Sequence, residues 1–483
     1  MKVLREKIMA QARVKQNLTE GPLFIPMIRY VIPIILSGML QIFYNMADNI
    51  VVGRFSGDSL ALAAVGSTSS LSNLIVNLLI GIAGGAGVVI AQSYGAKNLD
   101  KMKRAVHTSI LFSVIGGIAF CIFGMIISAP ALTLMDTKTE LMSRAVLYMR
   151  IICAGIPAMS VYNFGAATLR SVGDSKTPLF ILSLSGLCNV LLNLFFVIVC
   201  KMSVGGVAFA TIASQYISAV AVMAVLIRRK DMPYAIKKSM LKIDGGILKE
   251  ILRLGLPAGF QGTLFSISNI LLTSGMNTLA TTDISGKTIA INIEGLVHTS
   301  MNSYLHAAMT FTGQNYGAKK PDRIKKSIFY AIIQVTFVGI VGGQLLNLFA
   351  RPLASLYIDA ADPNKEAVLE AAVQLMGFML SVYFMCGLMD TLSGALRGLG
   401  YSMIPMVVSI GAICVLRAIW VFFVFPTERF HSLIGIYTIY PISWFLGLSA
   451  LAIALMILFK KIKIRLLEEA KNATLTEEIC EKQ

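Results

Sequence analysis

The sequence has 483 residues, of which 56% are hydrophobic and only 14% are charged, and its mean hydropathy is +0.74. A soluble domain carries about 25% charged residues, so this composition excludes an ordinary soluble protein. The net charge of +17 does not indicate nucleic-acid binding, because Lys and Arg are concentrated in short segments between apolar runs. That distribution is typical of membrane proteins. We expect a protein of the lipid bilayer with no nucleic-acid partner.

The apolar residues recur in runs of roughly 20, the length of helix that crosses a bilayer. In lipid the backbone must satisfy its own hydrogen bonds, which leaves helices or closed barrels. The runs at 110–127 and 328–348 do not alternate between polar and apolar residues, so helices are favoured. Twelve spans are predicted, at residues 25–52, 62–92, 104–129, 141–168, 178–200, 205–228, 248–280, 288–316, 324–349, 367–396, 403–425 and 434–459.

Three prolines, Pro33, Pro157 and Pro257, fall inside predicted spans and mark expected kinks. Seven cysteines are scattered along the chain with no CxxC pair. They are interpreted as small core residues, so we expect no disulfides. No cofactor and no dedicated metal site are expected either. The basic, polar residues 1–20 are interpreted as a tail, because no short apolar stretch leads to a cleavage site.

The distribution of Lys and Arg predicts the orientation. With the N-terminus inside, the cytoplasmic segments hold 32 of these residues, the outer segments hold 8, and Arg150 and Arg417 lie within spans. This excess predicts that both termini are cytoplasmic in the cell (plasma or inner) membrane. The predicted domains are a cytoplasmic tail at 1–24, a six-helix bundle at 25–228, a cytoplasmic linker at 229–247, a second bundle at 248–460 and a tail at 461–483.

The two halves of the sequence resemble each other. Residues 92–97, QSYGAK, recur at 314–319 as QNYGAK, at an offset of 222. Residues 168–173 recur at 395–400, at an offset of 227, and Pro33, Gly38 and Asn45 correspond to Pro257, Gly262 and Asn269, at an offset of 224. Each half holds six spans, so the repeats are parallel. Parallel repeats predict a transporter with a binding site between its halves that opens to alternate sides.

Both repeated signatures, with residues 44–49 (YNMADN) and 51–55 (VVGRF) of the first span, resemble the multidrug and toxic compound extrusion (MATE) family. The resemblance extends over roughly residues 22–460. It implies a V-shaped fold of twelve helices with a cavity between two bundles. It also implies export of organic cations driven by protons or sodium. We expect a monomer whose substrates are small-molecule organic cations, with any sodium bound at Asp48 or Asp390.

The first span carries Gln41, Tyr44, Asn45 and Asp48 at helical spacing, which places them on one face. An acid in a membrane interior usually marks function. Asp48 either takes up a proton, sodium or a cationic substrate, or is a carboxylate capped by neighbouring donors. Its counterpart in the second half is Leu272, so the repeated scaffold does not require the acid.

Span five places Ser185, Asn189 and Asn193 on one face. The proton-coupled branch of the MATE family often has an acid at the position of Asn193. An amide cannot ionise, so the resemblance predicts no pair of carboxylates between spans one and five. The alternative role for these residues is hydrogen bonding between helices.

Span eight holds Glu294, His298 and Asn302 on one face, and span ten holds Tyr383, Gly387, Asp390 and Gly394 on another. Asp390 corresponds to Asn163 of span four and resembles in kind the carboxy-half acid of the sodium-coupled branch. Asp48, Asp390 and Glu294 are the predicted coupling acids. Structural hydrogen bonding or capping remains the alternative for each. The predicted cavity residues are Gln41, Tyr44, Asn45, Asn163, Asn189, Asn193, Gln261, Asn269, His298, Asn302 and Tyr383.

Three other functions fit the sequence less well. A flippase or exporter of a lipid-linked or endogenous metabolite would need several cations in its cavity, for which only Arg417 and Arg150 are candidates. An enzyme is not expected, because the chain has four histidines and no HExxH or nucleophile-elbow motif. No filter-like sequence indicates a channel. Export of organic cations by exchange for protons or sodium is the preferred hypothesis.

Overall fold

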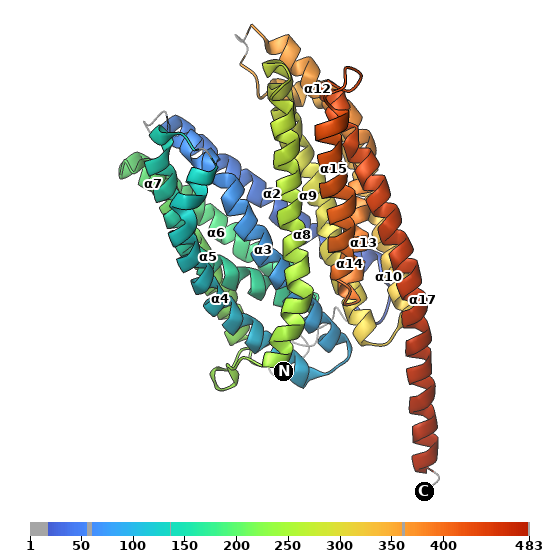
Figure 1. Cartoon of the computed structure of the whole chain (residues 1–483). Coiled ribbons are helices and arrows are strands. Elements are labelled where there is room, and N and C mark those ends of the chain that lie inside the picture. The colour runs from blue at the N-terminus through green and yellow to red at the C-terminus, as the bar shows by residue number, and fades with distance from the viewer. Residues whose placement is uncertain (1–17, 56–59, 136, 360–362, 482–483) are drawn as a thin grey trace. The chain divides into compact units, whose positions relative to one another are not determined.

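The computed structural model describes residues 18–55, 60–135, 137–359 and 363–481. Within these ranges all regular structure is helical, and no β-strand occurs among them (Figure 1). The prediction of an all-α protein is confirmed. Each of the twelve predicted spans falls on a helix or on a closely spaced series of helical segments.

The helical elements of the described first half come before α8, which begins the second half. Their bounds are α2 Phe24–Phe55, α3 Ala61–Gly95, α4 Leu99–Leu134, α5 Thr139–Ser171, α6 Lys176–Leu194, the π-helical segment η1 Phe195–Val199, α7 Ser203–Arg228 and, after the short 3-10 turn η2 Lys238–Met240, α8 Gly245–Met276.

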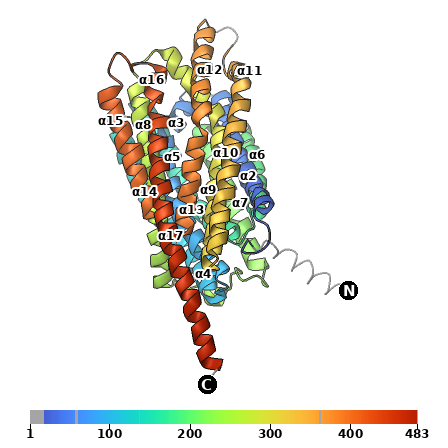
Figure 2. The same cartoon turned by 90° about the vertical axis from the view of Figure 1, so that its right-hand side faces the viewer.

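The second half continues in the same way. Its bounds are α9 Thr281–Gly317, α10 Pro321–Leu348, α11 Ala350–Ser355, α12 Lys365–Val382, α13 Phe384–Gly398, α14 Met403–Ser409, the π-helical segment η3 Ile410–Val415, α15 Leu416–Ile419, the π-helical segment η4 Trp420–Val424, α16 Leu433–Tyr437 and α17 Ile439–Glu481. Figure 2 shows α17 as one continuous helix.

Nine helices of the described chain are long and apolar enough to cross a membrane, and the count is ten if α12 and α13, bent by 44° at their break, form one span. The other two predicted spans correspond to α8 and α9, which are 32 and 37 residues long. Helix α9 is less apolar because it carries Asp283, Lys287 and Glu294. Many of its residues are buried. The predicted prolines lie within α2, α5 and α8.

The internal repeat is visible in the backbone. Lys97 and Lys319 both have a φ of 55°, and Gly173 and Gly400 both have a φ of 92°. Each ends a helix at the same place in its repeat. The closing hydrogen bonds match as well, because Asp174 N–H donates to the Leu169 carbonyl at 2.9 Å and Tyr401 N–H to that of Leu396 at 2.9 Å. Glycine suits the left-handed position after a helix, which explains its presence in both copies.

The described chain divides into two compact units. Of the described residues, 28–55, 60–94, 98–135 and 137–267 belong to unit 1, and 18–27, 95–97, 268–359 and 363–481 belong to unit 2. The division falls inside α8, and the first residues of α2 belong to unit 2. The domain boundaries at 24, 228, 247 and 460 remain predictions.

In unit 1, α3 and α8 pack closely because each has two glycines four residues apart. A Cβ on Gly81 would overlap the backbone of Gly259, and one on Gly85 would meet Gly255. Small residues at this spacing let two membrane helices approach each other. Farther along the same face, Asn77 Nδ2 donates to Ser266 Oγ at 3.1 Å. Helices α4, α5 and α7 also pack together in this unit (Figure 1).

The connection from α7 to α8 is tied to α4. Lys237 N–H donates to His107 Nε2 at 3.0 Å, and Asp244 N–H donates to Thr108 Oγ1 at 3.0 Å. Asp244 begins α8, since its Oδ1 accepts from Ile247 N–H at 3.1 Å, while its Oδ2 lies 3.0 Å from Arg104 Nη1. The hydrogen bond from Ile247, together with the Arg104 guanidinium, lowers the pKa of Asp244 from its usual 3.8.

In unit 2, the segment before α2 is held by the end of α9 and the start of α10. Arg323 donates to the carbonyls of Gly21 and Leu18 at 2.9 and 3.1 Å, and Lys320 Nζ donates to that of Thr19 at 3.0 Å. Asn315, which belongs to the repeated signature at 314–319, donates to the Leu18 carbonyl at 3.3 Å. These contacts fix the entry into α2.

Candidate functional site

The acid of α2 meets an amide of α6. Asn193 Nδ2 donates a hydrogen bond to Asp48 Oδ1, and the same amide lies 3.4 Å from Asn189 Oδ1, one turn earlier on α6. Asn193 and Asn189 are buried. Asp48 of the predicted polar face of span one therefore meets Asn193 of the predicted face of span five within unit 1.

Tight packing sets this arrangement. Tyr44 lies one turn before Asp48, and its hydroxyl donates to the Ser183 carbonyl at 3.3 Å. A Cβ on Gly186 of α6 would overlap the Tyr44 ring. The missing side chain at Gly186 therefore makes room for the ring and allows α2 to lie close enough for Asp48 to reach Asn193.

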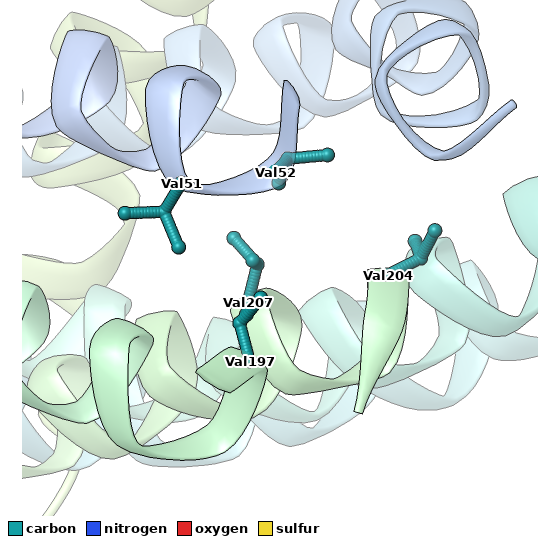
Figure 3. Packing of buried hydrophobic residues seen from close by; sticks show 5 residues of the cluster. All are labelled: Val51, Val52, Val197, Val204 and Val207. Carbon is teal, nitrogen blue, oxygen red and sulfur yellow. The ribbon is translucent and has the colours of Figure 1, made fainter. Parts of the chain in front are cut away.

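An apolar cluster follows the acid–amide pair along the chain (Figure 3). Val51 and Val52 follow Asp48 by about one turn, and Val197 follows Asn193 by one turn. They pack with Val204 and Val207 of α7, and all five are buried. Valine side chains offer no hydrogen bonds, and Tyr148, which packs against this cluster, is a further electrostatic neighbour of Asp48. Helix α6 continues there into the π-helical segment η1, a distortion frequent at functional sites.

Four other predicted cavity residues of the first half and α8 lie elsewhere. Gln41 and Asn45 are exposed on α2. Asn163 donates to the Met159 carbonyl of its own helix at 3.0 Å, and Gln261 is buried in α8. Arg150 is exposed on α5. The structure thus brings Tyr44, Asn189 and Asn193 to Asp48 and leaves these residues apart from the hydrogen-bonded pair.

The second acid, Asp390 of α13, meets α9 in unit 2. Asn302 Nδ2 donates to Asp390 Oδ2 at 3.1 Å. One turn before each residue lie His298 and Cys386, and a ring nitrogen of His298, the Cys386 sulfur and an Asp390 oxygen lie within 4.8 Å of one another. The His298 ring lies 6.1 Å from that of Tyr383. The predicted faces of spans eight and ten therefore form one polar cluster.

Glycines of α13 create this closeness. A Cβ on Gly387 would lie 2.7 Å from the Met301 sulfur of α9, and one on Gly394 would overlap the Leu305 backbone. One on Gly398 would lie 2.5 Å from the Met309 carbonyl oxygen. Gly394 and Gly398 form a GxxxG pair, the spacing that favours close packing of membrane helices.

Glu294 is the third predicted acid. It lies one turn before His298 on α9 and is only 3% exposed. Its Oε1 has no hydrogen-bond partner among the described residues. Tyr383, Tyr437 and Tyr440 are its electrostatic neighbours. A buried carboxyl oxygen without a partner costs free energy.

Arg417 is fully buried and anchors a cluster of aromatic residues. Its guanidinium carbon lies 4.1 Å from the centre of the Tyr440 ring. Its Nη1 donates to Asn269 Oδ1 at 3.1 Å, and its Nη2 lies 3.5 Å from Ser443 Oγ. Asn269, which is predicted to line a cavity, accepts this hydrogen bond from Arg417. In the internal repeat Asn269 is the counterpart of Asn45. The cation–π contact and hydrogen bonds give Arg417 a structural role in unit 2.

Sequence reasoning missed Cys386, Tyr437, Tyr440 and Trp444. Cys386 and Asp390 are four residues apart and share a face of α13. This spacing could have predicted that Cys386 lies beside the acid. Trp444 is 1% exposed, and its ring lies 5.3 Å from that of Tyr383, in a tilted arrangement, and 5.4 Å from that of Tyr440, in an edge-to-face arrangement. Tyr437, Tyr440 and Trp444 are spaced by three and four residues, a pattern that also suits ordinary helix packing.

The comparisons with known proteins agree with this architecture. The model of the family MatE matches the chain twice, at residues 33–195 and 257–423. The second match begins 224 residues after the first, which is the predicted repeat offset for Pro33 and Pro257. The internal repeat is thereby confirmed.

Relatives extend the likeness over nearly the whole chain. The "Probable multidrug resistance protein YoeA" of Bacillus subtilis is 28% identical over 95% of this chain and 96% of its own length. The "Probable multidrug resistance protein NorM" of Thermotoga maritima is 25% identical over 79% and 82%. A solved structure described as an outward-facing multidrug resistance MATE family transporter superposes with a TM-score of 0.82 at 22% identity, covering 93% of this chain and 97% of that one.

The helical fold, its apolar spans and the duplicated helices define an integral membrane transporter rather than an enzyme. The chain belongs to the MatE family, which matches it in both halves.

Proposed function

We propose that this chain is a secondary active antiporter that exports amphipathic organic cations in exchange for protons or sodium. In the proposal the two halves rock to expose a shared cavity alternately to each side of the cell membrane, and both termini are cytoplasmic. YoeA and NorM are named as probable multidrug resistance proteins, and this supports the substrate class. The excess of Lys and Arg in the predicted inner segments supports the orientation.

The observation that carries the proposal is the Asp48 carboxylate held by Asn193 between α2 and α6. A carboxylate in a membrane helix can be neutralised by a proton, by sodium or by an organic cation. These ligands then compete for one negative charge. Coupling follows if the coupling ion and the substrate bind the inward- and outward-facing states with different affinities. Asn193 can hydrogen-bond to the acid without adding a second charge.

Asp390 and Glu294 are proposed as further cation-binding acids in unit 2. Asn302 holds one carboxylate oxygen of Asp390, and Glu294 has a buried oxygen without a partner among the described residues. The polar cluster around His298 and Tyr383 would contribute to substrate contacts. Carboxylate oxygens bind both protons and sodium, so either ion can drive the proposed exchange.

The alternative, a flippase or exporter of a lipid-linked or endogenous metabolite, calls for cations that are available to an anionic group. The guanidinium of Arg417 packs on the Tyr440 ring and donates a hydrogen bond to Asn269 within unit 2. These contacts already engage the cation that an anionic substrate would need. We therefore favour cationic substrates.

The experiment is transport in proteoliposomes with separately imposed proton and sodium gradients. A fluorescent organic cation serves as substrate, and empty liposomes serve as control. We expect uptake against the cation's gradient under at least one ion gradient. Absence of transport under both gradients would contradict the proposed antiport. Transport of an anionic metabolite instead would favour the alternative.

A further inference from the structure

The polar cluster of α9 and α13 contains three side chains that can bind a transition metal. A ring nitrogen of His298, the sulfur of Cys386 and a carboxylate oxygen of Asp390 lie within 4.8 Å of one another. Cys386 is 2% exposed and is not part of a disulfide. This combination of imidazole, thiol and carboxylate is not needed to bind a proton, sodium or an organic cation.

The backbone arrangement favours such a site. Cys386 and Asp390 are four residues apart on α13, so their side chains share a face of that helix. His298 comes from α9, which the Gly387 contact with Met301 brings close. A ligand pair on one helix and a third ligand on its close neighbour is a rigid way to gather donors.

The second shell is also present. Asn302 Nδ2 donates to Asp390 Oδ2 at 3.1 Å, which orients the carboxylate and leaves Oδ1 for another ligand. The Tyr383 ring lies 6.1 Å from the His298 ring, tilted by 38°, and limits the orientations of the imidazole. Residues that orient metal ligands typically change metal affinity about 10–100-fold when removed.

We propose that His298, Cys386 and Asp390 form a binding site for Zn²⁺. Zinc binds sulfur, nitrogen and oxygen at about 2.0–2.3 Å, so tetrahedral ligand atoms lie about 3.5 Å apart. Separations of up to 4.8 Å require a closing movement of up to about 1.3 Å, within the reach of side-chain torsions. Three protein ligands leave a fourth position for water, as in zinc sites that exchange ligands.

The ligand chemistry selects the metal. Thiolate and imidazole favour Zn²⁺ and its transition-metal neighbours over Na⁺, Mg²⁺ and Ca²⁺, which prefer oxygen. Zinc binding requires the Cys386 thiolate, so the thiol proton is released to solvent on binding. The negative charges of Cys386 and Asp390 then balance the two positive charges of the metal.

The test uses Co²⁺ as a spectroscopic substitute for Zn²⁺ on the purified full-length protein in detergent micelles. We expect one Co²⁺ per chain, with the charge-transfer absorption of a cobalt–thiolate bond. Zn²⁺ should displace the Co²⁺, while a hundredfold excess of Mg²⁺ should leave the spectrum unchanged. Because no gradient or substrate is involved, failure of this test leaves the proposed antiport untouched, and failure of antiport leaves the metal site untouched.

Variants identify the ligands. Cys386→Ser should abolish the charge-transfer absorption, and His298→Gln and Asp390→Asn should each weaken Co²⁺ binding about 10–100-fold or more. Cys153→Ser, which alters a buried cysteine of unit 1, is the matched control and should bind Co²⁺ like the wild type. A variant that keeps Cys386 as its only cysteine should retain the absorption, which covers the case in which Cys386→Ser does not fold.

Two results would overturn the proposal. One is a wild-type protein without a cobalt–thiolate absorption. The other is loss of the absorption in the variant that keeps only Cys386, which would assign the thiolate to another cysteine.

Discussion

The side-chain amide of Asn193 donates a hydrogen bond to the carboxylate of Asp48. The two residues lie 145 positions apart, on α2 and α6, and they meet because Gly186 leaves room for the Tyr44 ring. The pair combines one ionisable group with one neutral donor. A cation that binds there meets a single negative charge.

The first prediction concerns the amide. Asn193→Leu keeps a similar volume but removes the donor, and hydrogen bonds to charged groups contribute about 1.5–3 kcal/mol. We expect cation transport in proteoliposomes to fall about tenfold or more at equal protein content. Asn163→Leu, which removes an amide bonded to its own helix, is the control and should transport nearly normally. Equal losses in both variants would argue against a special role for Asn193.

A second prediction tests the packing of Gly186 on Tyr44. In Gly186→Ala the new methyl group would overlap the Tyr44 ring, and overpacking of this kind costs about 1–3 kcal/mol. We expect a lower midpoint of thermal unfolding in detergent. Gly84→Ala, where a Cβ would meet nothing within 4 Å, should not be destabilised.

The same contact predicts a rescue. Tyr44→Ala removes the ring, so the double variant with Gly186→Ala should lose less stability than the sum of the two single variants. Neighbouring residues that interact show such non-additivity. Strict additivity in the four-way comparison of unfolding midpoints would mean that the ring and the glycine are not in contact.

Asp244 gives a prediction about pH. The amide of Ile247 and the Arg104 guanidinium lower its pKa below 3.8, so folding favours the ionised carboxylate. The stabilisation is fully present above the unfolded-state value near 3.8 and is lost as the pH falls through the lower folded-state pKa. Asp244→Asn should therefore unfold at a lower temperature than the wild type at pH 7, with the difference shrinking below about pH 4.

The control for this pH series is Asp100→Asn. The Asp100 side chain is 93% exposed and lies 3.8 Å from Lys103, and exposed ion pairs contribute little. We expect its unfolding midpoint to follow the wild type across the pH range. If Asp244→Asn follows the wild type as well, the capping and ion-pair role assigned to Asp244 is wrong.

Cys200 tests the predicted orientation. It is exposed and lies between η1 and α7, in a segment that the charge pattern places outside. A variant with Cys200 as its only cysteine should react with a membrane-impermeant maleimide in intact cells. A cysteine introduced by Lys238→Cys, in η2 of the linker, should react only after the membrane is opened. The reverse pattern would place both termini outside.

The helical fold and the repeat could be predicted from the sequence because both leave local signals. Apolar runs of bilayer length mark the spans, and the glycines at 173 and 400 recur because the same left-handed turn closes a helix in each half. Polar residues at helical spacing likewise identified Asp48, Asn193, Asn302 and Asp390 as facing a partner. The spacing of polar residues within one helix shows which face is polar, and this does not depend on which helix packs against that face.

Partners across helices were harder to predict. That Asn193 meets Asp48, or that Arg417 meets Asn269 and Tyr440, depends on how helices cross. The geometry with which two helices cross depends on close contacts at glycines, such as Gly387 with Met301. The spacing of glycines in the sequence does not show which helix makes the contact. Cys386 was missed for a related reason, since a cysteine in an apolar helix usually serves as a small core residue.

The measurement that tests the central claim most directly is transport by Asp48→Asn in proteoliposomes under the ion gradient that drives the wild type. The amide has nearly the same shape but cannot bind a proton or hold a negative charge. We predict that gradient-driven export of a fluorescent cation is abolished, while the variant stays folded with an unfolding midpoint near that of the wild type. Export at the wild-type rate by Asp48→Asn would contradict the assignment of Asp48 as the coupling acid.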